Sequence, residues 1–334
     1  MTTLITIHLA PGTYETTGGH GIPSNTLVLR RTMSQVSESL RDVSVHFVGR
    51  SKMFEGRAAP GEVIFDWGST PLVQVYSGTW YFENLQIGNR TYPRSQMGVH
   101  VLGTASLVHL RDVRVRTGSQ SGAGIYAGRG GEVRLYGCIE LNEDLHDKAK
   151  ANSFCGIIAD YDGAVRWRDA EGTLSMGNGT LSVSYFGIIE LGCKTAHITS
   201  WGRQSNCFAL NNSGRIDVHG TTTILSAKHP ENTLIGPEDD GHILAEGARI
   251  ILKTELGSPG KVVLQKSSTL FGGPFVIEGP SGVSFYAMSG STLVGGTVGN
   301  VDTVAADTGS YVSLSCDKRP AKVTETRNGK VNTQ

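Results

Sequence analysis

Residues 124–135 have the sequence GIYAGRGGEVRL, and residues 156–167 have the sequence GIIADYDGAVRW. Each begins with a glycine and a short apolar strand, turns through a polar or glycine corner, and ends in a second strand. Recurrence of one short unit predicts a repeat protein in which each unit packs on the next. The pattern returns in three later segments, which start at Gly187 (GIIELGCKTAHI), Cys207 (CFALNNSGRIDV) and Gly241 (GHILAEGARIIL).

Apolar residues occupy the same two places in all five segments, nine and eleven residues after the first. Such alternation is typical of a β-strand, because successive side chains point to opposite faces. Segments that start at Pro71 (PLVQVYSGTWYF) and Gly98 (GVHVLGTASLVHL) extend the pattern toward the N-terminus, the second with one extra residue. The predicted inward pairs are Val133 and Leu135, Val165 and Trp167, Ala196 and Ile198, Ile216 and Val218, and Ile250 and Leu252.

The starts of these segments lie 20 to 34 residues apart, which is typical of solenoids with insertions of variable length. We therefore expect an all-β, right-handed, single-stranded parallel β-helix whose inward side chains fill a continuous core. The 44 glycines among 334 residues disfavour a helical solenoid, since each would weaken a helix by about 1 kcal/mol. The register of the first strand of each coil stays open, because Ile243 and Ala245 fit the parity opposite to Val99 and Val101.

The β-helix is predicted to cover residues 1–315. Its coils after about residue 258 are rich in glycine and serine, so they form either thin final coils or a different β arrangement. Residues 316–334 have almost no apolar content and are predicted to be a polar C-terminal arm. Residues 33–42 and 140–152 break the β pattern and are predicted to be short helical insertions at coil corners.

Charge and cysteine content narrow the range of partners. Lys plus Arg and Asp plus Glu both total 30, so no global field attracts nucleic acid. No stretch approaches the roughly 18 consecutive apolar residues of a membrane span, so we expect no membrane insertion. The five cysteines are irregularly spaced and the ten histidines are dispersed, so we expect reduced, mostly buried thiols, no metal site and no cofactor.

The N-terminal strands carry a resemblance to a known family. Residues 5–15 (ITIHLAPGTYE) are followed by residues 26–31 (TLVLRR), residues 44–50 (SVHFVGR) and residues 62–67 (EVIFDW). This order resembles the first coils of the pectin-lyase-like superfamily of right-handed parallel β-helices. The resemblance implies the fold but leaves the activity open, because the superfamily contains pectate lyases, polygalacturonases, pectin methylesterases, alginate-modifying enzymes and bacteriophage tailspikes.

Within that superfamily, the glycine-rich later coils, the unpaired cysteines and the lack of an export signal look most like a bacteriophage tailspike or tail fibre protein. This resemblance implies a virion protein that assembles in the host cytoplasm with other virion tail proteins. It also implies a homotrimer that binds, and in some members cleaves, bacterial surface polysaccharide.

A polar column at the coil corners supplies the candidate site. Asp160 or Asp162 with Glu190 could provide the two carboxyl groups that glycoside hydrolysis requires, about 5 to 9.5 Å apart. The alternative is that polar corners are simply hydrated and that Asp or Asn in a turn bonds its own backbone. The proposed substrate-binding residues are Tyr161, Trp167 and Trp201, which could supply apolar faces for sugar rings, together with Arg129 and Asn211.

Two other functions stay open. A free polysaccharide lyase, hydrolase or esterase of the same fold would require a convergent cluster of carboxylates or an arginine in a groove. A purely structural virion component would bind no glycan and release no sugar ends. Whether the chain is an enzyme is therefore left undecided by the sequence.

Overall fold

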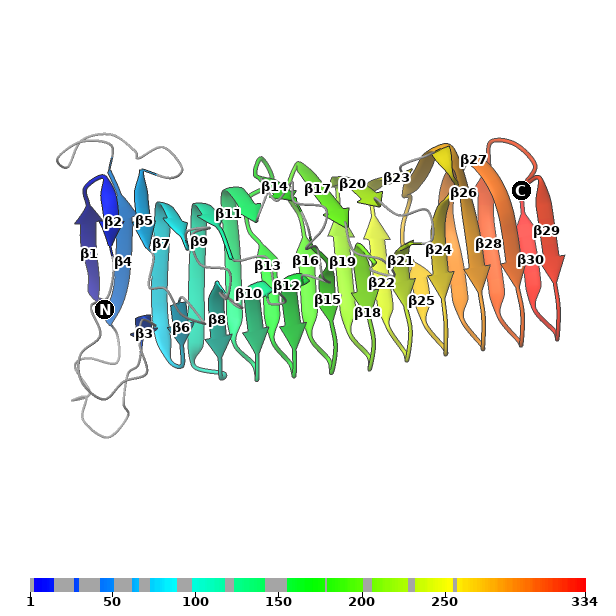
Figure 1. Ribbon diagram of the computed structural model, residues 1–334. Coiled ribbons are helices and arrows are strands. Elements are labelled where there is room, and N and C mark those ends of the chain that lie inside the picture. The colour runs from blue at the N-terminus through cyan, green and yellow to red at the C-terminus, as the bar shows by residue number, and fades with distance from the viewer. Residues whose placement is uncertain are drawn as a thin grey trace.

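The computed structural model describes residues 3–14, 27–29, 43–50, 62–65, 73–88, 98–117, 123–141, 155–177, 179–200, 206–227, 232–254 and 257–334. These residues form 30 β-strands and contain no α-helix. Every pairing between the strands is parallel, and strands far apart in sequence lie side by side along one elongated body (Figure 1). The expectation of an all-β chain built from parallel strands is confirmed.

The strands form three parallel ladders, each running the length of the body. The first ladder contains β3 (Leu27–Leu29), β6 (Val73–Val75), β8 (Val99–Leu102), β10 (Ala123–Gly128), β12 (Cys155–Asp160), β15 (Leu181–Val183), β18 (Phe208–Leu210), β21 (Thr233–Pro237), β24 (Gly260–Leu264), the second halves of β26 (Val276–Ala287) and β27 (Thr292–Ala306), and β29 (Lys322–Glu325).

The second ladder follows the first across a tight turn. It contains β1 (Thr3–Leu9), β4 (Val43–Gly49), the first halves of β7 (Gly78–Ile87), β9 (Ser106–Val115) and β11 (Glu132–Leu141), β13 (Ala164–Trp167), β16 (Ile188–Leu191), β19 (Arg215–His219), β22 (His242–Glu246), β25 (Thr269–Phe271), the starts of β27 and β28 (Tyr311–Cys316), and β30 (Lys330–Thr333).

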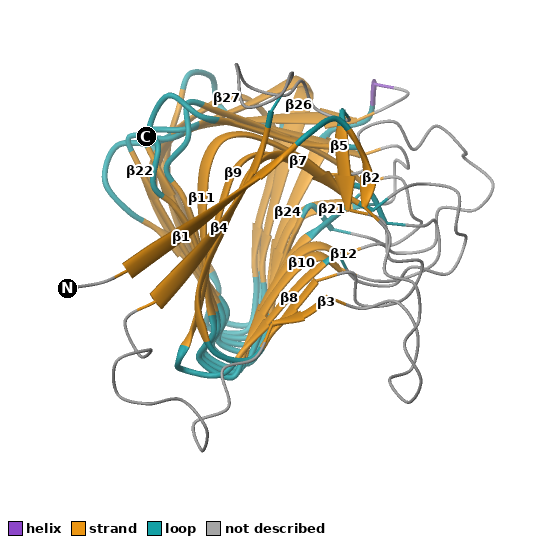
Figure 2. Cartoon of the chain, turned by 90° about the vertical axis from the view of Figure 1, so that its left-hand side faces the viewer, coloured by secondary structure: helices purple, strands orange, loops and turns teal. Residues whose placement is uncertain are grey.

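The third ladder completes each coil. It contains β2 (Gly12–Tyr14), β5 (Val63–Phe65), the ends of β7, β9 and β11, β14 (Thr173–Met176), β17 (Thr195–Ser200), β20 (Thr222–Ala227), β23 (Arg249–Thr254), the start of β26, the middle of β27 and the end of β28. Viewed along the body, the three ladders form three walls (Figure 2).

Alternate residues of the three walls point inward and form one continuous apolar core. All ten predicted inward residues are buried, from Val133 and Leu135 to Ile250 and Leu252. Ile243 and Ala245 are also buried, which fixes the register that the sequence left open. The core is contiguous because each inward side chain packs on the residue at the same place in the next coil.

The ladders correct the alignment of the repeats. Ile189 pairs with Val165, whereas Ala196 pairs with Leu174 of the third ladder. The segments at Gly187 and Gly241 therefore begin on the second ladder, whereas those at 124, 156 and 207 begin on the first. The confusion has a physical cause, because strands of both ladders follow a small residue and alternate with the same period of two.

The turn between the first and second ladders is built the same way in successive coils. Two residues with positive φ, such as Tyr161 (45°) and Asp162 (60°), precede a glycine or, in later coils, a serine, and the amide of Gly163 donates to the carbonyl of Asp160 at 2.9 Å. This is the geometry of a type I′ turn. The turn also bonds to the next coil, where the amide of Asp162 donates to the carbonyl of Tyr185 at 3.1 Å.

The predicted helical insertions are not seen. Glu140 and Leu141 end strand β11, and residues 33–42 and 142–152 lie outside the described residues. The segment 316–334 adds two mostly exposed strands, β29 and β30, to the first and second ladders. The glycine- and serine-rich region after residue 258 continues all three ladders.

Four cysteines are free thiols, namely Cys138, Cys193, Cys207 and Cys316. Cys193 and Cys207 are buried and Cys138 is exposed, so the expectation of buried thiols holds for part of the set. Burial raises the pKa of the Cys193 and Cys207 thiols to about 12, which keeps both groups protonated and unreactive at neutral pH. In the part of the chain that the structure describes, no helix has the length and apolar character to cross a membrane.

Replacing Gly163 with alanine tests the turn. A Cβ atom there would lie 2.1 Å from the carbonyl oxygen of Ala127 in the preceding coil, so the coils must move apart. We expect the free energy of unfolding in urea to fall by about 2 to 3 kcal/mol, in the range of overpacked sites. Gly192→Ala is the control, because the nearest atom to its Cβ is 4.0 Å away. Equal losses for the two variants would contradict this account of the turn.

Candidate functional site

Exposed aromatic side chains gather at the turns between the first and second ladders. Tyr161, Tyr185 and Phe186 occupy the positive-φ places of two successive turns and are 50%, 42% and 64% exposed. The rings of Tyr161 and Tyr185 stack with centroids 4.6 Å apart and an interplanar angle of 2°. These three residues are called the aromatic ledge below. It is exposed because the turns lie at the outer corner of the body (Figure 2).

Polar side chains continue the same column on both sides of the ledge. Arg129 lies at the turn of the preceding coil and Asn212 at the turn of the following one, and both are exposed. One coil further on, Asp239 forms an ion pair with Lys266 at 3.0 Å. The ledge is therefore an apolar part of a polar edge, and the polar residues on either side belong to the neighbouring strands, one spacing of about 5 Å away.

Asp160 lies just before the ledge and is held by its neighbours. Its Oδ1 accepts a hydrogen bond from the Ser184 hydroxyl at 3.0 Å, and its Oδ2 accepts one from the Tyr126 hydroxyl at 3.4 Å. Burial and the Asp160 carboxylate raise the pKa of Tyr126. Because these contacts join three successive coils, Asp160 fixes the position of the turn that carries Tyr161.

Glu190 lies on strand β16 of the second ladder and is paired with arginines. It contacts Arg166 in a short ion pair, and its other oxygen lies 3.5 Å from Arg168. Glu190 pairs with Arg166 on the second ladder, three residues beyond the turn glycine, whereas Asp160 ends a strand of the first ladder before the turn. The structure therefore does not bring Glu190 together with Asp160 or Asp162 in one cluster.

The remaining predicted residues are distributed as follows. Trp167 is 4% exposed in the core, and its indole N–H donates to the carbonyl of Asp169 at 2.7 Å. Asn211 is half-buried and its side chain accepts a hydrogen bond from Asn212 at 3.3 Å. Trp201 lies outside the described residues. Of the predicted site residues, Arg129, Tyr161 and Asp162 are thus at the exposed turn edge, where Tyr185 and Phe186 join them.

Sequence reasoning missed Tyr185 and Phe186. The signal was present, because both residues precede Gly187 as Tyr161 and Asp162 precede Gly163. The alignment of the segment at Gly187 with first-ladder strands conceals this signal, because that alignment places Glu190 at the corner in place of Tyr185 and Phe186.

A second outward column joins imidazole and phenol rings on the second ladder. His109 stacks on Tyr81 at 4.2 Å and lies parallel to Tyr136 at 5.8 Å, with its Nδ1 3.2 Å from the Tyr136 hydroxyl. Burial, assisted by Arg134, lowers the pKa of His109 to about 4. Burial and Arg129 also lower the pKa of His100, which lies on strand β8 of the first ladder, to about 4. Both imidazoles are therefore neutral at neutral pH.

The comparisons with known proteins give no relative. The chain matches no protein-family model, no curated protein and no solved structure. Within the described residues, no group of three or more His, Cys, Asp or Glu side chains could hold a metal ion.

The lowered pKa values of His100 and His109 predict acid sensitivity. The imidazole of an unfolded histidine has a pKa of about 6.5. Between pH 6.5 and 4 the unfolded chain therefore binds more protons than the folded chain, and the free energy of unfolding falls as the pH is lowered. Each residue contributes to this loss, and solvent screening at these partly exposed rings reduces the contribution. His109→Gln should flatten the dependence of the unfolding free energy on pH in this window, measured by urea titration at a series of pH values. An unchanged slope in His109→Gln would show that the imidazole titrates normally.

Proposed function

We propose that the chain is a right-handed parallel β-helix of a bacteriophage tail protein, and that its aromatic ledge binds bacterial surface polysaccharide. Three parallel ladders over one apolar core support the fold assignment, as does the resemblance of residues 5–67 to pectin-lyase-like proteins. The single observation that carries the binding role is the exposure of Tyr161, Tyr185 and Phe186 on adjoining turns.

The ledge suits a sugar chain for physical reasons. Exposed aromatic rings offer apolar area to the C–H faces of pyranose rings, and the Tyr hydroxyls offer hydrogen bonds. Arg129 and Asn212 flank the rings and provide donors to sugar hydroxyls on either side. A long polymer can lie along the turn edge and meet the same type of contact in successive coils.

Binding is favoured over cleavage at this edge. The Asp160 carboxylate is engaged by Ser184 and Tyr126, and the Glu190 carboxylate is engaged by Arg166 on a different wall. A pair of carboxyl groups for glycoside hydrolysis must face one bond from two sides. A depolymerase activity would therefore have to come from other residues, and a free enzyme of the same fold is the second candidate.

Assembly into a homotrimer with other virion tail proteins is part of the proposal. Side-by-side packing of elongated chains would give each virion several ledges, which raises avidity for a repetitive polymer without new contacts. Light scattering coupled to size-exclusion chromatography should give three times the mass of the chain. A monomer at micromolar concentration would remove the trimer from the proposal.

The double variant Tyr185→Ala/Phe186→Ala tests the ledge. We expect binding to capsular and O-antigen polysaccharides on a glycan array to weaken at least about tenfold, the effect of losing about 1.4 kcal/mol. The matched control is Tyr311→Ala/Phe271→Ala, which removes aromatic residues of 39% and 42% exposure elsewhere on the second ladder. Release of reducing ends from a bound polysaccharide would favour the enzyme, and no binding by the unmodified chain would favour a purely structural component.

A further inference from the structure

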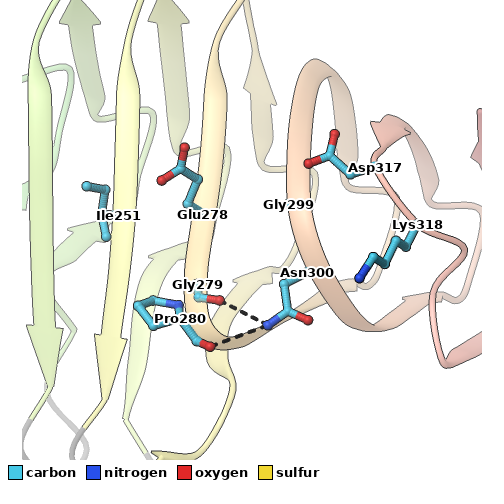
Figure 3. A pocket seen from close by; sticks show the side chains of 8 residues that line it. All are labelled: Ile251, Glu278, Gly279, Pro280, Gly299, Asn300, Asp317 and Lys318. Atoms are coloured by element: carbon cyan, nitrogen blue, oxygen red, sulfur yellow. Dashed lines mark hydrogen bonds between the residues drawn. The ribbon is translucent and has the colours of Figure 1, made fainter.

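A hollow of about 460 Å³ lies on the third ladder near the C-terminal end, away from the ledge. Its lining comes from strands β23, β26 and β27 and from the turn after β28 (Figure 3). The volume lies within the range of about 300 to 1,000 Å³ found for small-molecule sites. The lining residues are Ile251, Glu278, Gly279, Pro280, Gly299, Asn300, Asp317 and Lys318.

The hollow lies at the corner between the third and first ladders. Glu278 is the last residue of the third-ladder part of β26 and pairs with Gly299, and pairing resumes on the first ladder with Val283 and Val301. Asn300 adopts a positive φ of 58°, and its Nδ2 donates to the carbonyls of Gly279 and Pro280 at 3.3 and 3.5 Å. The Asn300 side chain therefore holds this corner in place.

A gap between two carboxylates forms the centre of the hollow. Gly299 lies between Glu278 on one side and Asp317 on the other, and the amide of Asp317 donates to the carbonyl of Val298 at 3.2 Å (Figure 3). A Cβ at Gly299 would lie 3.4 Å from the Asp317 carboxylate, so a larger side chain there would enter the gap. Glu278 and Asp317 lie two strand spacings apart, so their backbones are about 10 Å from each other.

The charges around the gap balance. Arg249 holds Glu278 by two hydrogen bonds of 2.7 and 3.2 Å, which leaves each Glu278 oxygen a further acceptor position. Among the described residues, neither the Asp317 carboxylate nor the Lys318 ammonium has an ion-pair partner, and both side chains are exposed. Lys318 points toward Asn300 (Figure 3), whose Oδ1 is another acceptor.

This composition discriminates among ligands. A free anion would meet Glu278 and Asp317, and a free cation would meet Arg249 and Lys318, so a charged group gains little net attraction. Hydroxyl groups both donate and accept, so they can satisfy the carboxylates and the ammonium together. Ile251 and Pro280 add apolar wall against which a ring can pack.

We propose that this hollow is a second binding site, independent of the ledge, for a single neutral sugar unit. The sugar hydroxyls donate to Glu278 and Asp317 and accept from Lys318, while one ring face packs on Pro280. The two glycines allow the ring to approach the backbone closely.

Saturation-transfer NMR in the Tyr185→Ala/Phe186→Ala background tests the site without a contribution from the ledge. The probes are the neutral methyl glycosides of glucose, galactose and mannose, with glucuronic acid and glucosamine as charged comparators. We expect at least one neutral glycoside to receive saturation and the charged sugars to receive less. Gly299→Leu should abolish the transfer by filling the gap, and Asp317→Asn should weaken the affinity at least about fivefold.

Gly192→Leu is the matched control, because this glycine also lies at an open place and has no positive φ, and it should leave the transfer unchanged. Thermal melting of every variant establishes that the fold is intact. Three results would each overturn the inference: no transfer to any neutral glycoside, equal transfer in Gly299→Leu, or stronger transfer to a charged sugar. The array experiment on the ledge is read independently, so failure here leaves the ledge proposal standing.

Discussion

The parallel ladder, with its strands about 4.8 Å apart, is the constraint from which the other features of this chain follow. Each residue has the corresponding residue of the next coil as its neighbour, so side chains of one kind form columns. Inward columns of Val, Ile, Leu and Phe make the core, in which residues such as Phe208 and Ile216 have no exposed surface. Because every coil depends on the one beside it, a Cβ added at a turn glycine disturbs two coils at once.

The same spacing brings outward side chains of neighbouring coils into contact. It places Tyr161 over Tyr185 as parallel rings, and His109 between Tyr81 and Tyr136. It also places Arg166 beside Glu190 as an ion pair on the second wall. A carboxylate in an unbroken column therefore meets the side chains directly above and below it, and these contacts occupy its hydrogen-bonding capacity before a ligand can.

Ligand-accessible places arise where a column ends or is interrupted. The ledge lies at the turn between the first and second ladders, where residues have positive φ. The hollow lies where the third-ladder part of β26 ends, beside Gly299. The two places differ in character. The ledge offers exposed rings along an edge that suits a polymer, whereas the hollow offers balanced charges in a space for one ring.

The sequence by itself determined the all-β character, the parallel stacking and the inward residues, because alternation and recurrence are local properties that each segment carries. Only the tertiary structure decided which ladder each segment joins, since many strands of the first and second ladders both begin after a glycine and both alternate with a period of two. That choice moved Glu190 away from the corner and brought Tyr185 and Phe186 beside Tyr161. It also brought together Glu278, Gly299 and Asp317, which no spacing in the sequence relates, because their proximity depends on the pairing of separate coils.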